Sequence, residues 1–286
     1  MMENNKGQLR YWSLVAMVPV MLAAFLSIIG TGGSSSDSLN LINCGPDEVS
    51  NRNFTAQEPF AFDINVVNHS ELLLNGKDGD VSITGMPGAT MIMVTGMKRV
   101  LSESVQDAQD HLQDLEVTVQ DLTTQALLRT DQPQCELGRE YIVDYTITLP
   151  DFFAVRINNI DGDVTLDSVD NEVSVNNITG TVTLTDIVGS VAVDLISGNI
   201  VAEITSLPLN GTIEMKILTG NIDLEIPTNT SADFSAKVFS GNINVTNLVL
   251  QNEVITATSV TGTLGSGQGD ILLETEVSGD IDVLGI

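Results

Sequence analysis

The sequence predicts an all-β protein, and three observations lead to that fold class. Nine-residue units follow one another without a gap from Phe153 to Ser197, each with apolar residues at its third, fifth and eighth positions. A polar residue separates the third and fifth positions, which is the alternation expected of a strand with one buried side. Valine, isoleucine and threonine dominate the units, and these residues suit a pleated, half-buried sheet.

The five units are FAVRINNID, GDVTLDSVD, NEVSVNNIT, GTVTLTDIV and GSVAVDLIS. Glycine opens three of them, where a turn is expected, and the apolar eighth residue is expected to point inward at the corner. One unit cannot bury its apolar side alone, so stacked units should share a continuous core. The sequence therefore predicts a single-stranded β-solenoid (β-helix) with roughly 18–22 residues per coil. A β-sandwich of antiparallel strands is the alternative.

The region before the repeat contains strands and one helix. Strand-like runs occupy residues 61–66, 71–74, 81–83, 91–94, 116–120 and 141–149. Residues 102–115 break the period of two, because Val105, Ala108, Leu112 and Leu115 recur at intervals of three and four. With Ser102 or Ser104 as N-cap, this segment predicts a short accessory helix that packs over one end or side of the sheet.

The N-terminus has the pattern of a targeting segment. Lys6 and Arg10 precede an uncharged apolar run and a small-residue stretch, so residues 1–30 are expected to be a secretory signal peptide. The run is also long enough for an uncleaved membrane anchor, which is the alternative. A Gly/Ser-rich spacer over residues 31–53 then leads to one domain over residues 54–286. The membrane enters this interpretation only through the N-terminal segment.

The charge balance excludes several partners. The chain has 38 acidic and 11 basic residues, for a net charge of −27. Such a protein lacks the basic surface that binds nucleic acid or an anionic leaflet. Two histidines and two cysteines leave little for a zinc site or a histidine-based active site. In an exported protein, Cys44 and Cys135 are expected to form a disulfide, and two unrelated thiols are the alternative.

Several pieces of the sequence, in their order, resemble the bacterial "putative adhesin" family, a domain of unknown function. They are Gly79-Asp-Val81, the helix before Leu115, the strand Tyr141–Pro150, serial Gly-Asn-Ile units, and the closing segment from Gly262 through Gly279-Asp-Ile281. The resemblance covers about residues 60–286. It implies a β-helix-like architecture and a non-enzymatic surface or envelope protein, and it brings no catalytic residues.

Carboxylates at the turns are the candidate cation ligands. Stacked turns could align them into an oxygen-rich ladder suited to calcium, which takes six to eight oxygens. The candidates are Asp161, Asp163, Asp270 and Asp280. Aspartate at a turn more often caps backbone groups, so the preferred interpretation is structural, with calcium as the alternative. No residue is assigned a catalytic or cofactor-binding role.

The sequence thus predicts an exported, non-enzymatic binding or structural module in the periplasm, at the cell surface or secreted. Its ligand would be an envelope or surface component, either a glycan or a protein. One alternative is a polysaccharide-active hydrolase or lyase on a β-helix. That alternative is disfavoured because the only tryptophan is Trp12, in the leader, and because Arg156 is the only basic residue between 140 and 215. Another alternative is an anchored envelope-stress scaffold.

Overall fold

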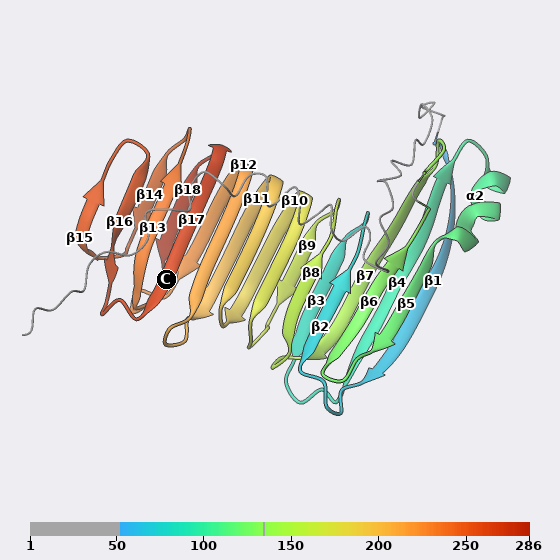
Figure 1. Cartoon of the computed structure of the whole chain (residues 1–286), viewed down its shortest axis with the longest axis horizontal. Helices are drawn as coiled ribbons and strands as arrows, with labels where there is room; N and C mark the ends of the chain where they lie inside the picture. Colours follow the sequence, from blue (N-terminus) through green and yellow to red (C-terminus); the bar gives the residue numbers. More distant parts are fainter. Residues whose placement is uncertain (1–51, 134) are drawn as a thin grey trace, which may run out of the picture. The chain divides into compact units, whose positions relative to one another are not determined.

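The computed structural model describes residues 52–133 and 135–286 (Figure 1). These residues form an all-β body whose eighteen strands belong to one open sheet, with one short α-helix. The predictions for the leader, for the spacer up to residue 51 and for Cys44 lie outside the described residues. Within the described ranges, no helix is long and apolar enough to cross a bilayer.

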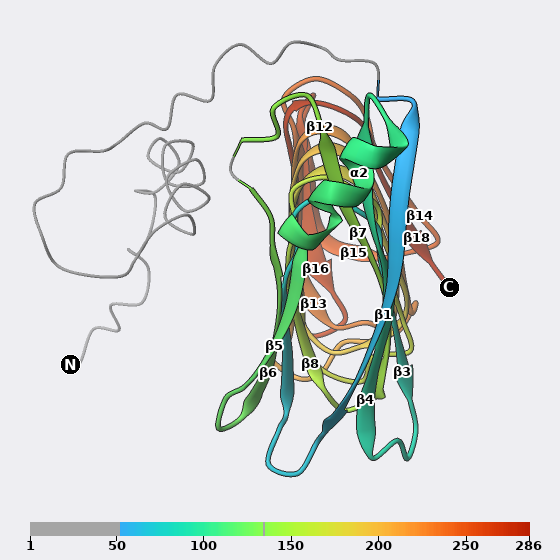
Figure 2. The same cartoon turned by 90° about the vertical axis from the view of Figure 1, so that its right-hand side faces the viewer.

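The sheet folds over on itself into two halves that face each other across an apolar core (Figure 2). Half A contains β5 (Glu116–Asp121), β6 (Gln125–Asp131), β2 (Glu71–Asn75), β8 (Ala154–Asn158), β17 (Gly269–Ser278), β13 (Ala232–Val238), β16 (Ser259–Leu264) and β15 (Leu250–Ile255). Half B contains β1 (Phe54–Asn65), β4 (Met91–Ser102), β7 (Glu140–Pro150), β3 (Val81–Met86), β9 (Val164–Asp167), β18 (Ile281–Gly285) and β14 (Ile243–Thr246). The long strands β10 (Val173–Val188), β11 (Val191–Ser206) and β12 (Thr212–Ile226) bend at a corner and run through both halves.

Each pass through half A and then half B forms one coil, and successive coils pair in parallel. Val173 pairs with Val155 on one side and with Val191 on the other, so these partners are 18 residues apart. Val191 pairs with Ile213, 22 residues further along. These separations lie within the predicted range for a coil. The parallel pairing differs from that of an antiparallel sandwich, and the antiparallel pairs lie toward the two ends of the sheet.

The coils do not stack in chain order at the two ends. The coil of β2 and β3 lies between β6–β7 and β8–β9. The coil of β17 and β18 lies between β12 and the outer coil of β13 and β14. After β12 the chain therefore forms the outer coil of β13 and β14 first and adds the antiparallel hairpin β15–β16 to it. Strands β17 and β18 then fill the position between β12 and that outer coil.

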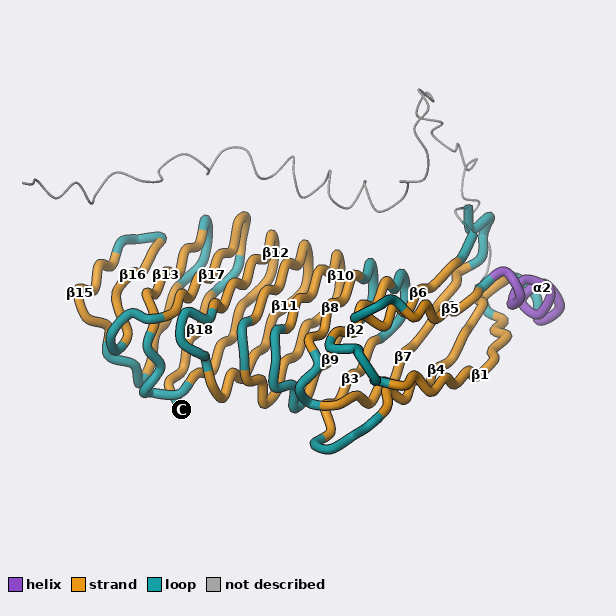
Figure 3. The backbone as a smooth tube through the Cα atoms, turned by 60° about the horizontal axis from the view of Figure 1, so that its bottom comes forward, coloured by secondary structure: helices purple, strands orange, loops and turns teal. Residues whose placement is uncertain are grey.

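A column of glycines forms one corner of the stack (Figure 3 shows the loops between strands). All have positive φ between 128° and 149°, a region that side chains disfavour; they are Gly79, Gly162, Gly180, Gly198, Gly220, Gly279 and Gly241. A Cβ built on Gly198 would overlap the carbonyl oxygen of Gly180 in the adjacent coil. The same overlap recurs down the column, so the coils can approach only where a side chain is missing.

The interior of this corner differs from the sequence expectation. The eighth residue of the unit was expected to point inward, but Ile160 is 39% exposed. The residue before it points inward instead, because the amide of Asn159, like that of Asn177, can satisfy the carbonyl groups that the turn buries. The Asn177 amide donates to the carbonyl oxygens of Gly162 and Thr179, both at 2.9 Å. At the opposite corner, Val169 is buried as expected.

The predicted accessory helix is present as α2 (Val105–His111), followed by the 3-10 turn η1 (Leu112–Asp114). Ser104 is its N-cap and accepts the backbone N–H of Asp107 at 3.1 Å. The helix packs against β1 and β4 through buried Ala108, which confirms its expected place over one end. Val105, expected on the apolar face, is exposed because it is the first helical residue and lies beyond the contact.

Candidate functional site

The outer side of half B presents a row of hydroxyl groups in register. Five neighbouring strands each contribute one hydroxyl at the same level, in the order Thr95, Thr146, Ser82, Thr165 and Thr183. Each follows an inward-pointing apolar residue, so its own side chain faces outward. Adjacent strands in a sheet lie about 4.8 Å apart, which sets the repeat of the row. We call these five residues the hydroxyl row.

A second row runs beside the hydroxyl row and, apart from one methionine, is also polar and weakly charged. Its members lie two residues from the hydroxyl row on the same strands and are Met93, Thr148, Thr84, Asp167 and Thr185. Asp167 is the only charged residue among the ten positions of both rows. In a chain of net charge −27 this surface is therefore unusually neutral. It can offer hydroxyl donors and acceptors together with methyl groups to a neutral, hydroxyl-rich ligand.

Acidic and amide side chains line the corner next to these rows, where each turn begins half B. The Asp163 carboxylate accepts the backbone N–H of Thr181 at 2.7 Å, and the Asp80 carboxylate accepts that of Asp163 at 2.9 Å. Further along the stack, Asp280 accepts the backbone N–H of Asn242 at 2.7 Å. We call this arrangement the corner ladder. Its side-chain oxygens cap the backbone of the adjacent coil, which is the structural role preferred from the sequence.

The structure does not bring the four candidate cation ligands together. Asp163 and Asp280 both belong to the corner ladder, but several coils separate them. Asp161 lies two residues before Asp163, and Asp270 lies in half A on β17. Among residues 52–133 and 135–286, no group of three acidic, histidine or cysteine side chains is placed to hold a metal ion.

A shallow hollow of about 390 Å³ lies over β12, β17 and β13. Asp270 and Asp233 are direct neighbours on its adjacent strands, and Glu214 contributes a third carboxylate. Asp233 accepts the Thr263 hydroxyl at 3.1 Å, and Glu214 forms an ion pair with Lys216. If the chain were a polysaccharide-active enzyme, this hollow would supply the pair of carboxylates that such an enzyme needs.

Burial perturbs several titratable groups, all outside this hollow. Burial raises the pKa of Asp194 and of Asp223, and the neighbouring Asp282 raises that of Asp223 further. At the corner before the glycines, burial raises the pKa of Asp78, with Asp161 adding to the effect and the Gln132 amide opposing it. Burial also lowers the pKa of Lys77 beside them. Perturbed groups thus occur along the stack rather than at one catalytic centre.

One cysteine of the predicted disulfide and the histidine His69 lie in the described part of the chain. Cys135 is disulfide-bonded, but its expected partner Cys44 lies outside the described residues, so the pairing stays a prediction. His69, one of the two histidines, has a buried side chain that is only 4% exposed. It bridges the turn after β1, contacting the Asn65 carbonyl oxygen at 3.1 Å and the Asp121 carboxylate at 2.8 Å. These contacts give it a structural role.

Sequence reasoning missed the hydroxyl row, although a signal for it exists. Alternate nine-residue units belong to different halves, so the true period is eighteen. In the two units of half B the fourth residue is Thr165 or Thr183, whereas in half A it is Arg156, Ser174 or Ala192. Analysis at a period of nine averages the two outer surfaces and hides the difference.

The fold and this surface define a class of protein: an all-β stack of coils with a neutral, hydroxyl-bearing side and, in the part described, no group of side chains placed to hold a metal ion. Within that class, the chain belongs to the Toastrack DUF4097 family, which matches residues 61–284. None of the curated proteins compared with the chain is similar enough to match.

Solved structures with distant similarity come from several bacteria. A "putative cell adhesion protein" from Clostridium sporogenes is 10% identical, with a TM-score of 0.41 over 81% of this chain and 100% of its own. A "putative adhesin" from Bacteroides fragilis is 14% identical, with a TM-score of 0.30 over 82% of this chain and 99% of its own. A "putative lipid binding protein" from Parabacteroides distasonis is 10% identical, with a TM-score of 0.30 over 78% and 96%. These likenesses are too distant to carry an inference about function.

Proposed function

We propose that this chain is an exported, non-enzymatic, adhesin-like module of the cell envelope or surface, built as a two-sided β-solenoid over residues 54–286. The observation that carries the proposal is the hydroxyl row, in register across five strands on a nearly uncharged surface. Regularly spaced hydroxyl groups suit a repeating, neutral, hydroxyl-rich ligand such as a polysaccharide chain. The absence of aromatic residues from both rows favours weak contacts repeated many times over one tight pocket.

Export is supported by two features. The leader pattern of residues 1–30 is typical of secretory signals, and a disulfide at Cys135 is typical of proteins in an oxidising compartment. The proposed locations are the periplasm, the cell surface or the medium. An uncleaved leader would instead anchor the module in the membrane, as in the alternative of an envelope-stress scaffold.

The alternative of a hydrolase or lyase rests on the hollow that contains Asp233 and Asp270. A glycosidase needs one carboxyl group held protonated and another ionised, with aromatic residues often stacking on the sugar. Phe234 is the only aromatic residue that lines the hollow, and it is 2% exposed. The hollow therefore supports catalysis less well than the hydroxyl row supports binding.

The test is a binding screen of the labelled full chain on bacterial polysaccharides, glycans and intact cells. Each surface is probed in excess EDTA and again in millimolar calcium, and every polysaccharide is assayed for new reducing ends and unsaturated products. The proposal expects binding to at least one polysaccharide or cell surface, equal in both buffers, without turnover. Turnover of a polysaccharide that is lost in Asp270→Asn, with no stable binding under any condition, would establish the enzyme instead.

A further inference from the structure

The two ends of the sheet are finished differently. At one end, α2 packs against β1 and β4. At the other end, half B stops at β14 and half A stops at the hairpin β15–β16, and no helix of the described chain covers them (Figure 1). We call this second end, formed by β14, β15 and β16, the β14 end. Stacked-coil proteins need a cap at each end, because the last coil otherwise exposes its core and its strand edge.

Three of the four outermost strands carry protection against edge-to-edge pairing. β1 contains Pro59 directly after Glu58, and β5 begins and ends with acidic residues. β15 has an irregular register between Gln251 and Val254, with Asn252 at a φ of 51°.

The fourth outermost strand, β14, lacks such a device. Its sequence Ile-Asn-Val-Thr has no charge and no proline, and its pairing with β18 is regular. Among the described strands β18 is its only partner, so the opposite edge of β14 presents unpaired backbone groups.

Apolar surface lies beside this open edge. Ile243 and Val245 belong to the core side of β14 but are only half-buried. A cleft of about 220 Å³ separates β14 from the β15–β16 hairpin, with Ile243 on one side and Ile255 and Val260 on the other. Ile255 is 66% exposed. The core thus reaches the surface at the β14 end, where contact with another molecule would bury it.

The charge distribution indicates which molecule fits. Residues 242–264, which include β14, β15 and β16, contain one charged residue, Glu253, in a chain of net charge −27. Two copies of so acidic a chain repel one another over most approaches. They can meet without like-charge contact where the surface is neutral. A basic partner would be attracted to the acidic parts of the surface, so the neutral β14 end favours self-association.

We propose that the β14 end binds a second copy of this chain, with the two β14 strands pairing antiparallel about a twofold axis. Residues that oppose one another in an antiparallel pair point to the same side of the sheet. A pairing centred on Asn244 therefore places Asn244 opposite its own copy, and Ile243 opposite Val245 of the other chain. The pairing satisfies the open edge of β14 and buries the half-exposed core residues. It is independent of the proposed ligand.

The nearest acidic residues tolerate this arrangement. Asp282 lies on β18, one strand in from β14, and accepts the Asn244 amide at 2.7 Å. In the dimer the two copies of Asp282 would be three strand spacings apart, about 14 Å, which exceeds the Debye length of about 8 Å at physiological salt.

The experiment compares the full chain with two single-lysine variants by sedimentation velocity across a hundredfold concentration range. Asn244→Lys places two lysines opposite each other in the dimer, while in the monomer the lysine lies beside Asp282 and should preserve the fold. Ala61→Lys is the matched control, because Ala61 occupies the same outward level on β1 at the opposite end of half B. Circular dichroism melts verify that each variant is folded.

The wild-type chain and Ala61→Lys are expected to shift from monomer to dimer as concentration rises, with at least tenfold weaker association in Asn244→Lys. A wild-type chain that stays monomeric throughout, or an Asn244→Lys variant that dimerises like the wild type, would overturn the proposal. Long oligomers that both variants abolish would indicate head-to-tail stacking of β14 on β1, and would overturn it as well.

Discussion

The carboxylate of Asp163 accepts the backbone N–H of Thr181, eighteen residues further along the chain, at 2.7 Å. That contact joins equivalent positions of two neighbouring coils. It explains why acidic residues recur at these turns without forming a cation site, because the oxygen that would ligate a metal already caps the next coil. The same relation holds between Asp80 and Asp163 and between Asp280 and Asn242.

Calcium should therefore leave the stability of the fold unchanged. We expect the melting temperature in excess EDTA and in 5 mM calcium chloride (an assay concentration of about that order is ample for a weak site) to agree within about 1 °C. Differential scanning fluorimetry measures this directly. A calcium-dependent rise of several degrees that disappears in Asp163→Asn would show that the corner ladder binds the ion after all.

The glycine column should be the least tolerant feature of the stack. Gly198→Ala places a methyl group onto the carbonyl oxygen of Gly180 at a φ of 140°, so we expect a loss of more than about 3 kcal/mol in the free energy of unfolding. Gly88→Ala is the control, because Gly88 also has positive φ but nothing lies within 4 Å of an added Cβ. That variant should lose about 1–2 kcal/mol. Equal losses in urea unfolding would mean that backbone conformation alone, and not close packing of coils, requires these glycines.

The buried asparagine of the same corner should also matter for stability. Asn177→Ala leaves the carbonyl groups of Gly162 and Thr179 without their amide donor, which should cost about 1–3 kcal/mol. The adjacent Asn176 points outward and donates to the Asn158 side chain at 3.1 Å. Asn176→Ala should cost no more than about 0.5 kcal/mol. Chemical denaturation of both variants tests the difference, and the account fails here if the outward residue proves the more important.

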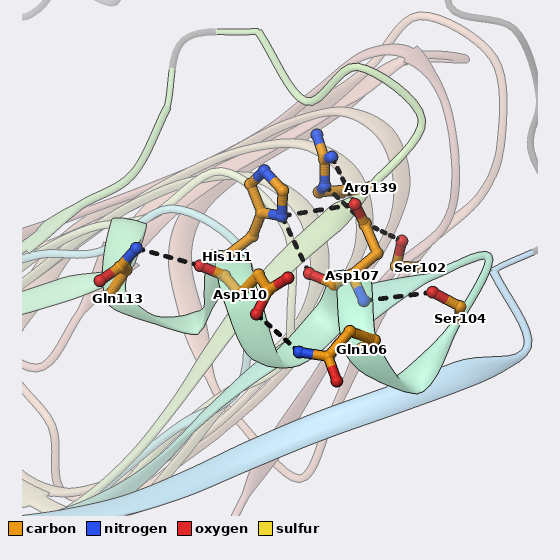
Figure 4. A network of polar contacts seen from close by, with 8 residues as sticks. All are labelled: Ser102, Ser104, Gln106, Asp107, Asp110, His111, Gln113 and Arg139. Carbon is orange, nitrogen blue, oxygen red and sulfur yellow. Dashed lines mark hydrogen bonds and ion pairs between the residues drawn. The ribbon is translucent and has the colours of Figure 1, made fainter.

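The contact between Asp107 and Arg139 should make the attachment of α2 sensitive to acid (Figure 4). Arg139 donates to both carboxylate oxygens, at 2.7 and 2.8 Å, and with the Ser102 hydroxyl lowers the pKa of Asp107 to about 2. Because the folded pKa lies below the ordinary value of 3.8, the contribution is complete above that value and is lost as pH falls toward 2. Allowing for partial exposure, we expect about 1 kcal/mol.

Asp107→Asn isolates this contribution, because amide and carboxylate have the same shape. The variant should be less stable than the wild type at pH 7, and the gap should close as pH falls from 4 to 2. Asp110→Asn is the control, since Asp110 is exposed on the same helix and accepts only the Gln106 amide and therefore lacks an arginine partner. A gap that stays constant from pH 7 to pH 2 would contradict the assigned cause.

The sequence was enough to predict the strands of the repeat, the helix and the length of a coil, because each leaves a local period. Val173, Val175 and Val182 alternate with polar residues as a half-buried strand must, and Ser104 precedes a helical spacing. Stacking order left no such trace. Gly279-Asp-Ile281 and Gly241-Asn-Ile243 are nearly identical starts of a strand. Nothing in the local sequence shows that the strand after Gly279 lies between β12 and the strand after Gly241.

The candidate site was missed for a related reason. The outward residues of the two halves obey the same period-two rule, so only the pairing of Thr165 with Thr183, and of Ser82 with Thr146, shows that they share one surface. The turn aspartates were visible in the sequence, but their bonding partners belong to the neighbouring coil.

The most direct test of the account is a comparison of polysaccharide or cell-surface retention between two matched double variants. Thr165→Glu with Thr183→Glu alters two adjacent members of the hydroxyl row, whereas Ser174→Glu with Ala192→Glu makes the same change on two paired strands of half A. At equal thermal stability, the account predicts at least a tenfold loss of retention for the first pair and wild-type retention for the second. Undiminished retention by the Thr165→Glu, Thr183→Glu protein would show that the hydroxyl row is not the binding surface.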